Sequence, residues 1–271
     1  MARVLIGTSG YVYGDWRRRF YPRDVPARDW LPFYAARFPT VELNSPFYRL
    51  PRAATFRAWA AAVPPEFVFA VKASRFLTHI KRLRDPGPPL TLFMKRARGL
   101  GETRGPILFQ LPARFHANLE RLDGFLTALA RRRLGRAVLE VRHGSWLTDE
   151  VYERLARANV ALCLHDWREQ PVTGPLTADF VYVRRHGTRL RYGGSYTERM
   201  LRADAARIAD WTAGGRDVYV YFNNDGRAAA VRNARTLTLY TSRAIAPHNV
   251  EEVNAWGCVR RRPCGVKKRA S

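Results

Sequence analysis

The chain has 271 residues, of which 47 are Lys or Arg and 23 are Asp or Glu, so its formal net charge is +24. Hydrophobic residues make up 46% of it, too many for a disordered composition, and no apolar run approaches the roughly 18 residues of a membrane span. Residues 1–7 lead directly into a predicted strand without a signal-peptide pattern, so we expect a cytoplasmic protein without a membrane partner.

The basic excess has two interpretations. A solvated basic surface attracts polyanions only diffusely, whereas a nucleic-acid or phosphorylated partner would use the charge directly. The basic groups form scattered clusters at 17–19, 131–133, 184–185 and 260–262. The charge therefore allows nucleic acid as a partner but does not identify a specific binder.

Eight short apolar runs, most of them followed by a helical pattern, predict the fold. Each run has the length of a buried strand and ends in polar or charged residues, and the eight are 3–9, 40–47, 66–74, 105–112, 136–143, 160–166, 180–187 and 217–224. Eight strand–helix units in a chain of this length predict an α/β fold of the TIM-type (β/α)8 class, a closed parallel sheet with outer helices. We expect one barrel domain over residues 1–243 and a basic, partly disordered tail over 244–271.

Apolar spacing places helices after most of these strands. The predicted helices are 29–38, 52–63, 90–100, 118–134, 148–159, 195–214 and 226–239. The segment after the sixth strand, 167–179, contains two prolines and a glycine and predicts a loop or a degenerate helix. The long first loop, 10–28, carries Tyr11 and Trp16, which would either shape a ligand pocket at the barrel mouth or pack across its rim.

Alternation along the strands predicts a polar interior near their carboxyl ends. Outward apolar residues such as Val41 and Leu43 bracket Glu42, and Leu139 and Val141 bracket Glu140 in the same way. The side chains that this rule turns inward are Glu42, Asn44, Lys72, Gln110, Glu140, Arg142, Arg184 and His186. Because buried charges require partners, these residues form either a ligand site at the mouth or an ionic network that only fills the barrel.

As a ligand site, this set predicts organic acid–base chemistry on an anion. Glu140 or Glu42 would accept a proton, while Lys72, Arg142 or Arg184 would hold a phosphate or carboxylate. We assign catalytic roles to Glu140, Glu42, Lys72 and His186. We assign ligand binding to Asn44, Gln110, Arg142, Arg184, Asn223, Asn224, Tyr11 and Trp16.

A metal centre is the alternative for the same end of the barrel. Glu140, His143, Asp166 and His186 offer N and O ligands for one divalent ion. However, neither a His-x-His nor a His-Glu-x-x-His pattern is present, and strand parity turns His143 away from Glu140. We therefore predict no metal ligands as the first interpretation and leave the cofactor open, with a divalent metal as the alternative.

The motifs at these strand ends resemble those of the YecE-like family, catalogued as domain of unknown function 72. The matching stretches, in chain order over about residues 4–239, are 7–11, 15–16, 20–22, 41–44, 47–51, 69–74, 78–79, 109–112, 140–143, 145–146, 166, 185–187 and 221–225. The resemblance implies a TIM-type barrel and no particular reaction. The chain departs from the family pattern at Arg184-Arg185, where an apolar residue commonly precedes the His-Gly, so either arginine could point inward. The Arg-rich tail lies outside the match.

Three functions follow from these observations. The first is an enzyme, a hydrolase or acid–base catalyst, that acts on a phosphorylated or otherwise anionic substrate. The second is a nucleic-acid-binding protein or a metal-dependent nuclease, which rests on fold analogy and charge. The third is a non-catalytic barrel whose ionic interior serves stability.

Overall fold

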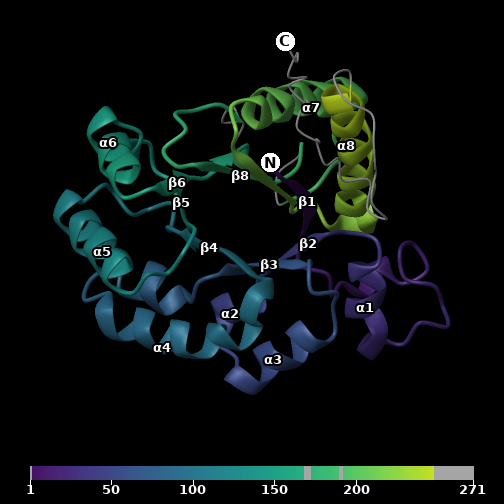
Figure 1. Cartoon of the computed structure of the whole chain (residues 1–271), viewed down its shortest axis with the longest axis horizontal. Helices are drawn as coiled ribbons and strands as arrows, with labels where there is room; N and C mark the ends of the chain where they lie inside the picture. Colours follow the sequence, from purple (N-terminus) through teal and green to yellow (C-terminus); the bar gives the residue numbers. More distant parts are fainter. Residues whose placement is uncertain (1, 168–171, 189–191, 247–271) are drawn as a thin grey trace, which may run out of the picture.

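Nine parallel strands form one sheet that curves into a nearly closed barrel (Figure 1). The computed structural model describes residues 2–167, 172–188 and 192–246. The strand order is β6-β5-β4-β3-β2-β1-β9-β8-β7. The strands are β1 (Val4–Ser9), β2 (Thr40–Leu43), β3 (Val68–Lys72), β4 (Arg104–Gln110), β5 (Ala137–Glu140), β6 (Val160–Leu162), β7 (Leu164–His165), β8 (Phe180–Arg185) and β9 (Asp217–Phe222). The predicted TIM-type barrel is confirmed.

The sixth predicted strand is divided, which explains why nine strands replace eight. β6 pairs with β5 and β7 pairs with β8, with Cys163 between the two segments. The amide of Cys163 still donates to the carbonyl oxygen of Leu139 at 2.9 Å. One continuous run therefore contacts both neighbours and bridges the two ends of the sheet. Cys163 is buried, as predicted.

Helices surround the barrel on its outside (Figure 1). They are α1 (Trp30–Ala35), α2 (Ser45–Tyr48), α3 (Ala53–Ala61), α4 (Gly87–Ala97), α5 (Leu119–Arg131), α6 (Asp149–Arg157), α7 (Glu198–Ala213) and α8 (Ala229–Ile245). All seven predicted helices are present with shifted ends, and the four-residue α2 was not predicted. Of the predicted segment 167–179, Trp167 lies in a 3-10 turn and residues 172–179 contain no helix, while 168–171 lie outside the described residues, so the choice between a loop and a degenerate helix stays a prediction.

Two apolar layers hold this arrangement together. The outer layer lies between strands and helices and includes Val41, Leu139 and Val183. The inner layer fills the barrel and comprises Leu5, Val68, Ala70, Leu108, Val138, Ala161, Cys163, Phe180, Tyr182, Tyr219 and Tyr221. Strand alternation therefore sorts side chains as the sequence predicted. The inner layer fills the barrel below its polar end, and the polar residues lie at the carboxyl ends of the strands.

The predicted boundary between barrel and tail falls within the last helix. α8 runs to Ile245, beyond the expected end of the domain at residue 243. The rest of the predicted tail, 247–271, lies outside the described residues, so this division stays a prediction. Among the described helices, none has both the length and the apolar character needed to cross a bilayer.

Candidate functional site

Arg184 of β8 lies at the centre of the polar interior and contacts both predicted glutamates. Its Nη1 donates to Oε2 of Glu140 at 2.6 Å, and its Nη2 donates to Oε1 of Glu42 at 2.8 Å. All three side chains are buried, with 1%, 0% and 0% of the Arg184, Glu140 and Glu42 side chains exposed. The barrel therefore brings charges from β2, β5 and β8 together on its axis.

Neutral hydroxyls complete the coordination of Glu42. Tyr182 donates to its Oε2 at 2.7 Å, and Ser9 donates to its Oε1. Ser9 also accepts from Nδ2 of Asn44 at 2.9 Å and from Nη2 of Arg184 at 3.1 Å. Both oxygens of Glu42 are thus occupied, and the carboxylate is held rigidly.

A second arginine and a histidine flank Glu140. Nε of Arg142 donates to Oε1 of Glu140 at 2.7 Å, and Nε2 of His186 lies 3.6 Å from the same oxygen. Burial alone would raise the pKa of Glu140, but the guanidiniums of Arg184 and Arg142 outweigh it and hold that pKa well below its usual range. Two carboxylates and two guanidiniums therefore compensate one another, and Glu140 is a weak proton acceptor at neutral pH.

Lys72 adds a charge that this network does not pair. It ends β3, and its Nζ lies 4.2 Å from the ring centre of Phe47. Among the described residues, no carboxylate lies within 4.0 Å of Nζ. Burial, helped by the nearby charge of Arg184, lowers the pKa of Lys72 to about 7. The amine can therefore accept and release a proton near neutral pH.

Two aromatic residues that sequence reasoning did not assign to the site surround these charges. Trp167 stacks under the Arg142 guanidinium, with 4.2 Å between the guanidinium carbon and the ring centre, and lies 5.5 Å from the His186 ring. His79 contacts Phe47, and burial together with the charge of Lys72 lowers the pKa of His79 to about 4. Strand alternation could have found Ser9 and Tyr182, but nothing in the sequence pattern marks Trp167.

Several buried polar atoms at this end lack a hydrogen-bond partner within the described part of the chain. They are Asn44 Oδ1, Arg142 Nη2, Trp167 Nε1 and His186 Nε2. Asn223 Nδ2 lies 3.2 Å from Nδ1 of His186, so when it donates there the ring proton is on Nε2. Burial lowers the pKa of His186 to about 4, which keeps the ring neutral. Arg142, Trp167 and His186 all lie beside Tyr192, whose ring centre is 5.2 Å from that of Trp167 and 5.5 Å from that of His186. Each of the three carries one N–H that could be donated to a ligand.

The structure resolves which of the two neighbouring arginines points inward. Arg184 faces the barrel axis, whereas Arg185 faces outward and contacts Asp166 at 3.2 Å and Asp204 of α7 at 3.1 Å. Asp166 also accepts from the backbone amide of His186 at 2.6 Å and from Tyr196 at 2.5 Å. Asp166 thus braces the end of β8 from outside.

Gly187 explains why a glycine follows His186 in the family motif. Its φ is +109°, and a Cβ at this position would lie 2.3 Å from the carbonyl oxygen of Gly193. Only glycine permits this backbone conformation and this close approach of the following loop.

The remaining predicted residues separate into two groups. Gln110 ends β4, aligns with Glu140 in the sheet and is buried with the site. Asn224 instead donates to Asn233 of α8 and to the Gly194 carbonyl, both at 2.9 Å, and so fastens a helix and a loop. His143 contacts Ser145 and stacks on His116, with ring centres 3.8 Å apart.

The first-loop aromatics lie in packing positions. Trp16 is fully buried, donates from Nε1 to the Asp225 carbonyl at 2.8 Å and stacks on Tyr21. Tyr11 packs against Tyr34 and accepts through its carbonyl from Tyr21 at 2.6 Å. Neither residue contacts the charged network, whereas Tyr13 from the same loop donates to the Ser9 carbonyl at 2.5 Å.

The four residues of the metal alternative are not brought together. Within residues 2–167, 172–188 and 192–246, no three His, Cys, Asp or Glu side chains are placed to hold one ion. Glu140 and His186 lie 3.6 Å apart, but Asp166 is occupied by Arg185, Tyr196 and the His186 amide, and His143 contacts Ser145.

Comparisons with known proteins agree with the fold and the motifs. The model of the family described as "Protein of unknown function DUF72" matches residues 5–252. The UPF0759 protein YunF of Bacillus subtilis is 24% identical over 272 residues, which cover 86% of this chain and 93% of that protein.

Solved structures of DUF72 family proteins share the barrel. One from Thermotoga maritima superposes with a TM-score of 0.76 at 28% identity and covers 85% of this chain and 96% of its own. Another, from Enterococcus faecalis, has a TM-score of 0.73 at 17% identity and covers 88% and 97%. The resemblance drawn from the sequence motifs is thus confirmed, and the chain belongs to the DUF72 family of proteins of unknown function.

Proposed function

We propose that the carboxyl end of the barrel binds a small anionic ligand and that Lys72 transfers a proton to or from it. The observation that carries this proposal is the unpaired, desolvated amine of Lys72 beside an ionic network that is already balanced. If the ionic interior served stability alone, a paired lysine would stabilise the fold, whereas an unpaired buried lysine does not. A phosphate or carboxylate of the ligand would supply the missing partner.

The ligand's anionic group would contact the donors that have no partner. Arg142 Nη2 and Trp167 Nε1 lie on stacked side chains, and His186 adds a third N–H from the neighbouring strand end. A guanidinium and two ring N–H groups suit a carboxylate or a phosphate. From the sequence, Glu140 or Glu42 was expected to be the proton acceptor, but both glutamates are engaged by Arg184, so this arrangement favours Lys72 in that role.

Within this proposal, Glu42 and Glu140 are positioning residues. They hold Arg184 on the axis, and Glu140 also orients Arg142 through Nε, which leaves Nη2 for the ligand. The carboxylates would therefore set the geometry of the anion site without exchanging protons themselves.

Binding of anions tests the first half of the proposal. Inorganic phosphate and malonate serve as probes in isothermal titration of the whole chain and of two matched variants, Arg142→Gln at the mouth and Arg57→Gln at an exposed position of α3. We expect Arg142→Gln to weaken binding at least tenfold and Arg57→Gln to retain it. Equal affinity in Arg142→Gln and the unaltered chain would overturn the proposed site.

Hydrogen exchange tests the second half. A panel of small phosphorylated and carboxylated compounds is incubated with the protein in D2O, and loss of C–H signals is followed by NMR. We expect exchange on at least one compound, abolished by Lys72→Met and kept by Arg57→Gln. Exchange that survives Lys72→Met, or its absence across the panel, would refute proton transfer by Lys72.

A further inference from the structure

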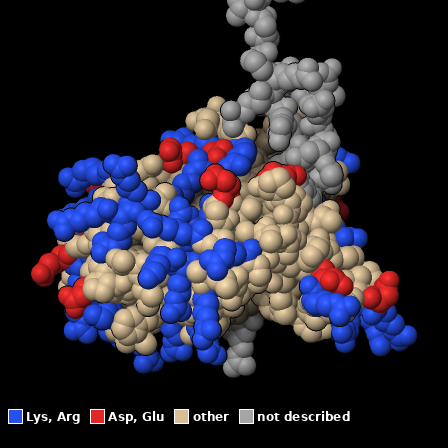
Figure 2. All heavy atoms as spheres, turned by 60° about the horizontal axis from the view of Figure 1, so that its bottom comes forward, with Lys and Arg blue, Asp and Glu red and all other residues tan. Residues whose placement is uncertain are grey.

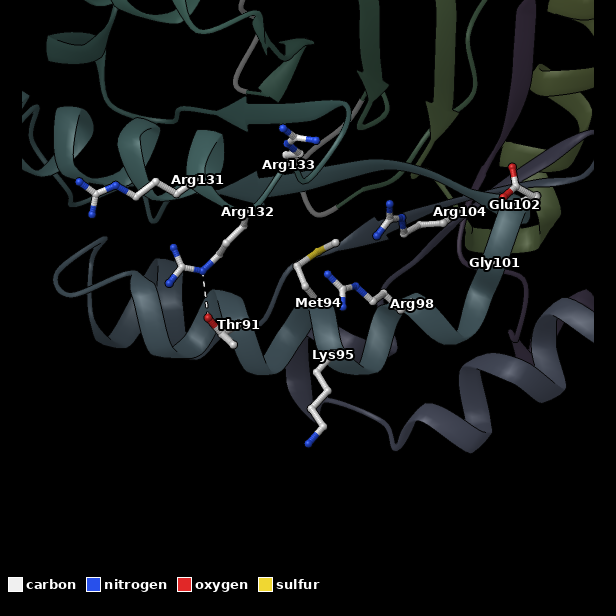
Figure 3. A pocket seen from close by; sticks show the side chains of 10 residues that line it. All are labelled: Thr91, Met94, Lys95, Arg98, Gly101, Glu102, Arg104, Arg131, Arg132 and Arg133. Atoms are coloured by element: carbon white, nitrogen blue, oxygen red, sulfur yellow. Dashed lines mark hydrogen bonds between the residues drawn. The ribbon is translucent and has the colours of Figure 1, made fainter.

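A basic groove lies at the opposite end of the barrel from the proposed ligand site. It lies between α4 and the end of α5 and has a volume of about 870 Å³ (Figure 3). Arg104, which begins β4, lines it, as do Arg131–Arg133, which precede β5. These are the amino ends of the strands, whereas Lys72 and Glu140 lie at carboxyl ends. The groove is thus separate from the mouth.

Six cations line this groove against one carboxylate. They are Lys95, Arg98, Arg104, Arg131, Arg132 and Arg133, and the carboxylate is Glu102. No ion pair within 4.0 Å involves any of the six among the described residues. A neighbouring hollow contains Arg3 and Arg136, but both pair with Asp217, at 3.7 and 2.6 Å. Apart from Arg104, which lines both hollows, the arginines of that hollow are therefore neutralised, whereas the cations of the groove are not.

The groove is also partly preorganised. Nε of Arg132 donates to Thr91 of α4 at 2.9 Å, and its Nη1 donates to the Ala128 carbonyl at 3.0 Å, so the guanidinium is fixed across the gap between two helices. Burial, with the nearby charge of Arg98, lowers the pKa of Arg104. Like charges are therefore held close together, and an anion that neutralises them would relieve the repulsion.

The chemistry of the lining indicates which anion fits. Guanidiniums bind phosphate oxygens through two parallel N–H groups, and the groove is too large for a single phosphate. None of the residues that line it is aromatic, so it offers no ring on which a base would stack. On the face shown in Figure 2, Lys and Arg side chains cover much of the left part, with few Asp or Glu among them. These features suit an extended chain of phosphates.

We propose that the Arg131–Arg133 groove binds the phosphodiester backbone of a nucleic acid without reading its sequence. Contacts would go to phosphates, which position a nucleic acid but carry no sequence information. Because the groove and the mouth lie at opposite barrel ends, the protein would hold a nucleic acid and a small ligand at the same time.

Fluorescence anisotropy with a labelled 20-nucleotide single-stranded RNA tests this groove. Binding is also measured to DNA of the same sequence and to a duplex, and each affinity is determined across a salt series. The test variant replaces Arg131, Arg132 and Arg133 by Gln. The control replaces Arg18, Arg19 and Arg23, exposed residues of the first loop, by Gln and removes the same charge.

We expect the groove variant to bind the RNA about tenfold more weakly or worse, and its log–log salt slope to fall by about 2, since each lost phosphate contact on a single strand removes about 0.7. The RNA affinity of the control variant should stay close to that of the unaltered chain. Equal losses of affinity in both variants would show that net charge alone attracts the RNA. Absence of RNA binding by the unaltered chain would also refute the proposed groove.

A second pair of variants separates binding from folding and from the mouth. Arg131→Gln with Arg133→Gln leaves the Arg132 contacts to Thr91 and Ala128 in place and should still weaken RNA binding at least threefold. Lys72→Met should leave RNA affinity unchanged. A loss of RNA affinity in Lys72→Met would place the nucleic acid at the mouth instead and refute the groove.

Discussion

The arginines at the two ends of this barrel differ in burial and in ion pairing. At the carboxyl end, Arg184 is buried and has a carboxylate on each side, at 2.6 and 2.8 Å. At the amino end, Arg131 and Arg133 are exposed, and no carboxylate pairs with either in the described part of the chain. The charge of Arg184 is neutralised by its two carboxylates, so this side chain has a structural role. Arg131 and Arg133 have no such partner, and neither has Lys72 at the mouth, so these three cations are available to a ligand.

The largest effect expected from this contrast is on stability. Arg184→Met leaves Glu42 and Glu140 buried without a shared cation, so we expect the free energy of unfolding to fall by about 3–5 kcal/mol. The same substitution at exposed Arg133 should change it by no more than about 0.5 kcal/mol. Urea unfolding measures both. Similar values for the two variants would contradict the assignment of Arg184 as scaffold.

Glu140→Gln should have the next largest effect, about 2–3 kcal/mol, because Arg184 keeps Glu42 while Arg142 loses its carboxylate. The folded pKa of Glu140 lies well below the ordinary 4.5, so its contribution is present above about pH 4.5 and is lost as the pH falls. The difference in free energy of unfolding between the unaltered chain and Glu140→Gln should therefore become smaller below pH 4.5. Unfolding curves from pH 3 to 7 check this, and a deficit that stays constant would contradict it.

Lys72→Met should act in the opposite direction. With a folded pKa of about 7 against the ordinary 10.5, charged Lys72 costs stability at low pH, and this cost disappears as the pH rises from about 7 to 10.5. We expect the Met variant to be more stable by about 1–3 kcal/mol at pH 6.5 and the difference to narrow by pH 9.5. A less stable variant at pH 6.5 would show that Lys72 is paired.

The smallest effect on stability belongs to the groove. Arg131→Gln with Arg133→Gln should leave the free energy of unfolding within about 1 kcal/mol at moderate salt, because neither side chain is buried or paired. The change should be toward higher stability at low salt, where like-charge repulsion is least screened. Thermal unfolding at two salt concentrations measures the sign of this change in stability. A large loss of stability would indicate that Arg131 or Arg133 forms an ion pair.

Strand alternation was sufficient to predict the inward set of charges. Side chains alternate between the two faces of each strand, and the carboxyl ends of all strands lie at the same end of the barrel. Glu42, Glu140 and Arg184 therefore point inward at the same level and meet. Alternation also turned Arg184 inward, whereas the departure from the family motif at Arg184-Arg185 had left the choice open; the contacts of Arg184 with Glu140 and of Arg185 with Asp166 agree with the alternation. The division at Cys163 was also missed, because both halves remain apolar and their hydrogen bonds go to different neighbours.

What the sequence could not show was which charges lack partners. Lys72 has no carboxylate within 4.0 Å in the described part of the chain, because Arg184 lies between Glu42 and Glu140 and contacts both. Trp167 reaches the site from a loop without periodicity. The groove combines Lys95 with Arg131–Arg133, some forty residues apart, and only the packing of α4 beside α5 brings them together.

The pKa of Lys72 tests the central claim most directly. The chain has only five lysines, so the side-chain signals of a protein labelled with 13C-lysine can be assigned by comparison with Lys72→Met. We expect the Lys72 signal to titrate near pH 7 and its pKa to shift upward when phosphate is added. A Lys72 signal that titrates near 10.5 and ignores phosphate would contradict the proposal.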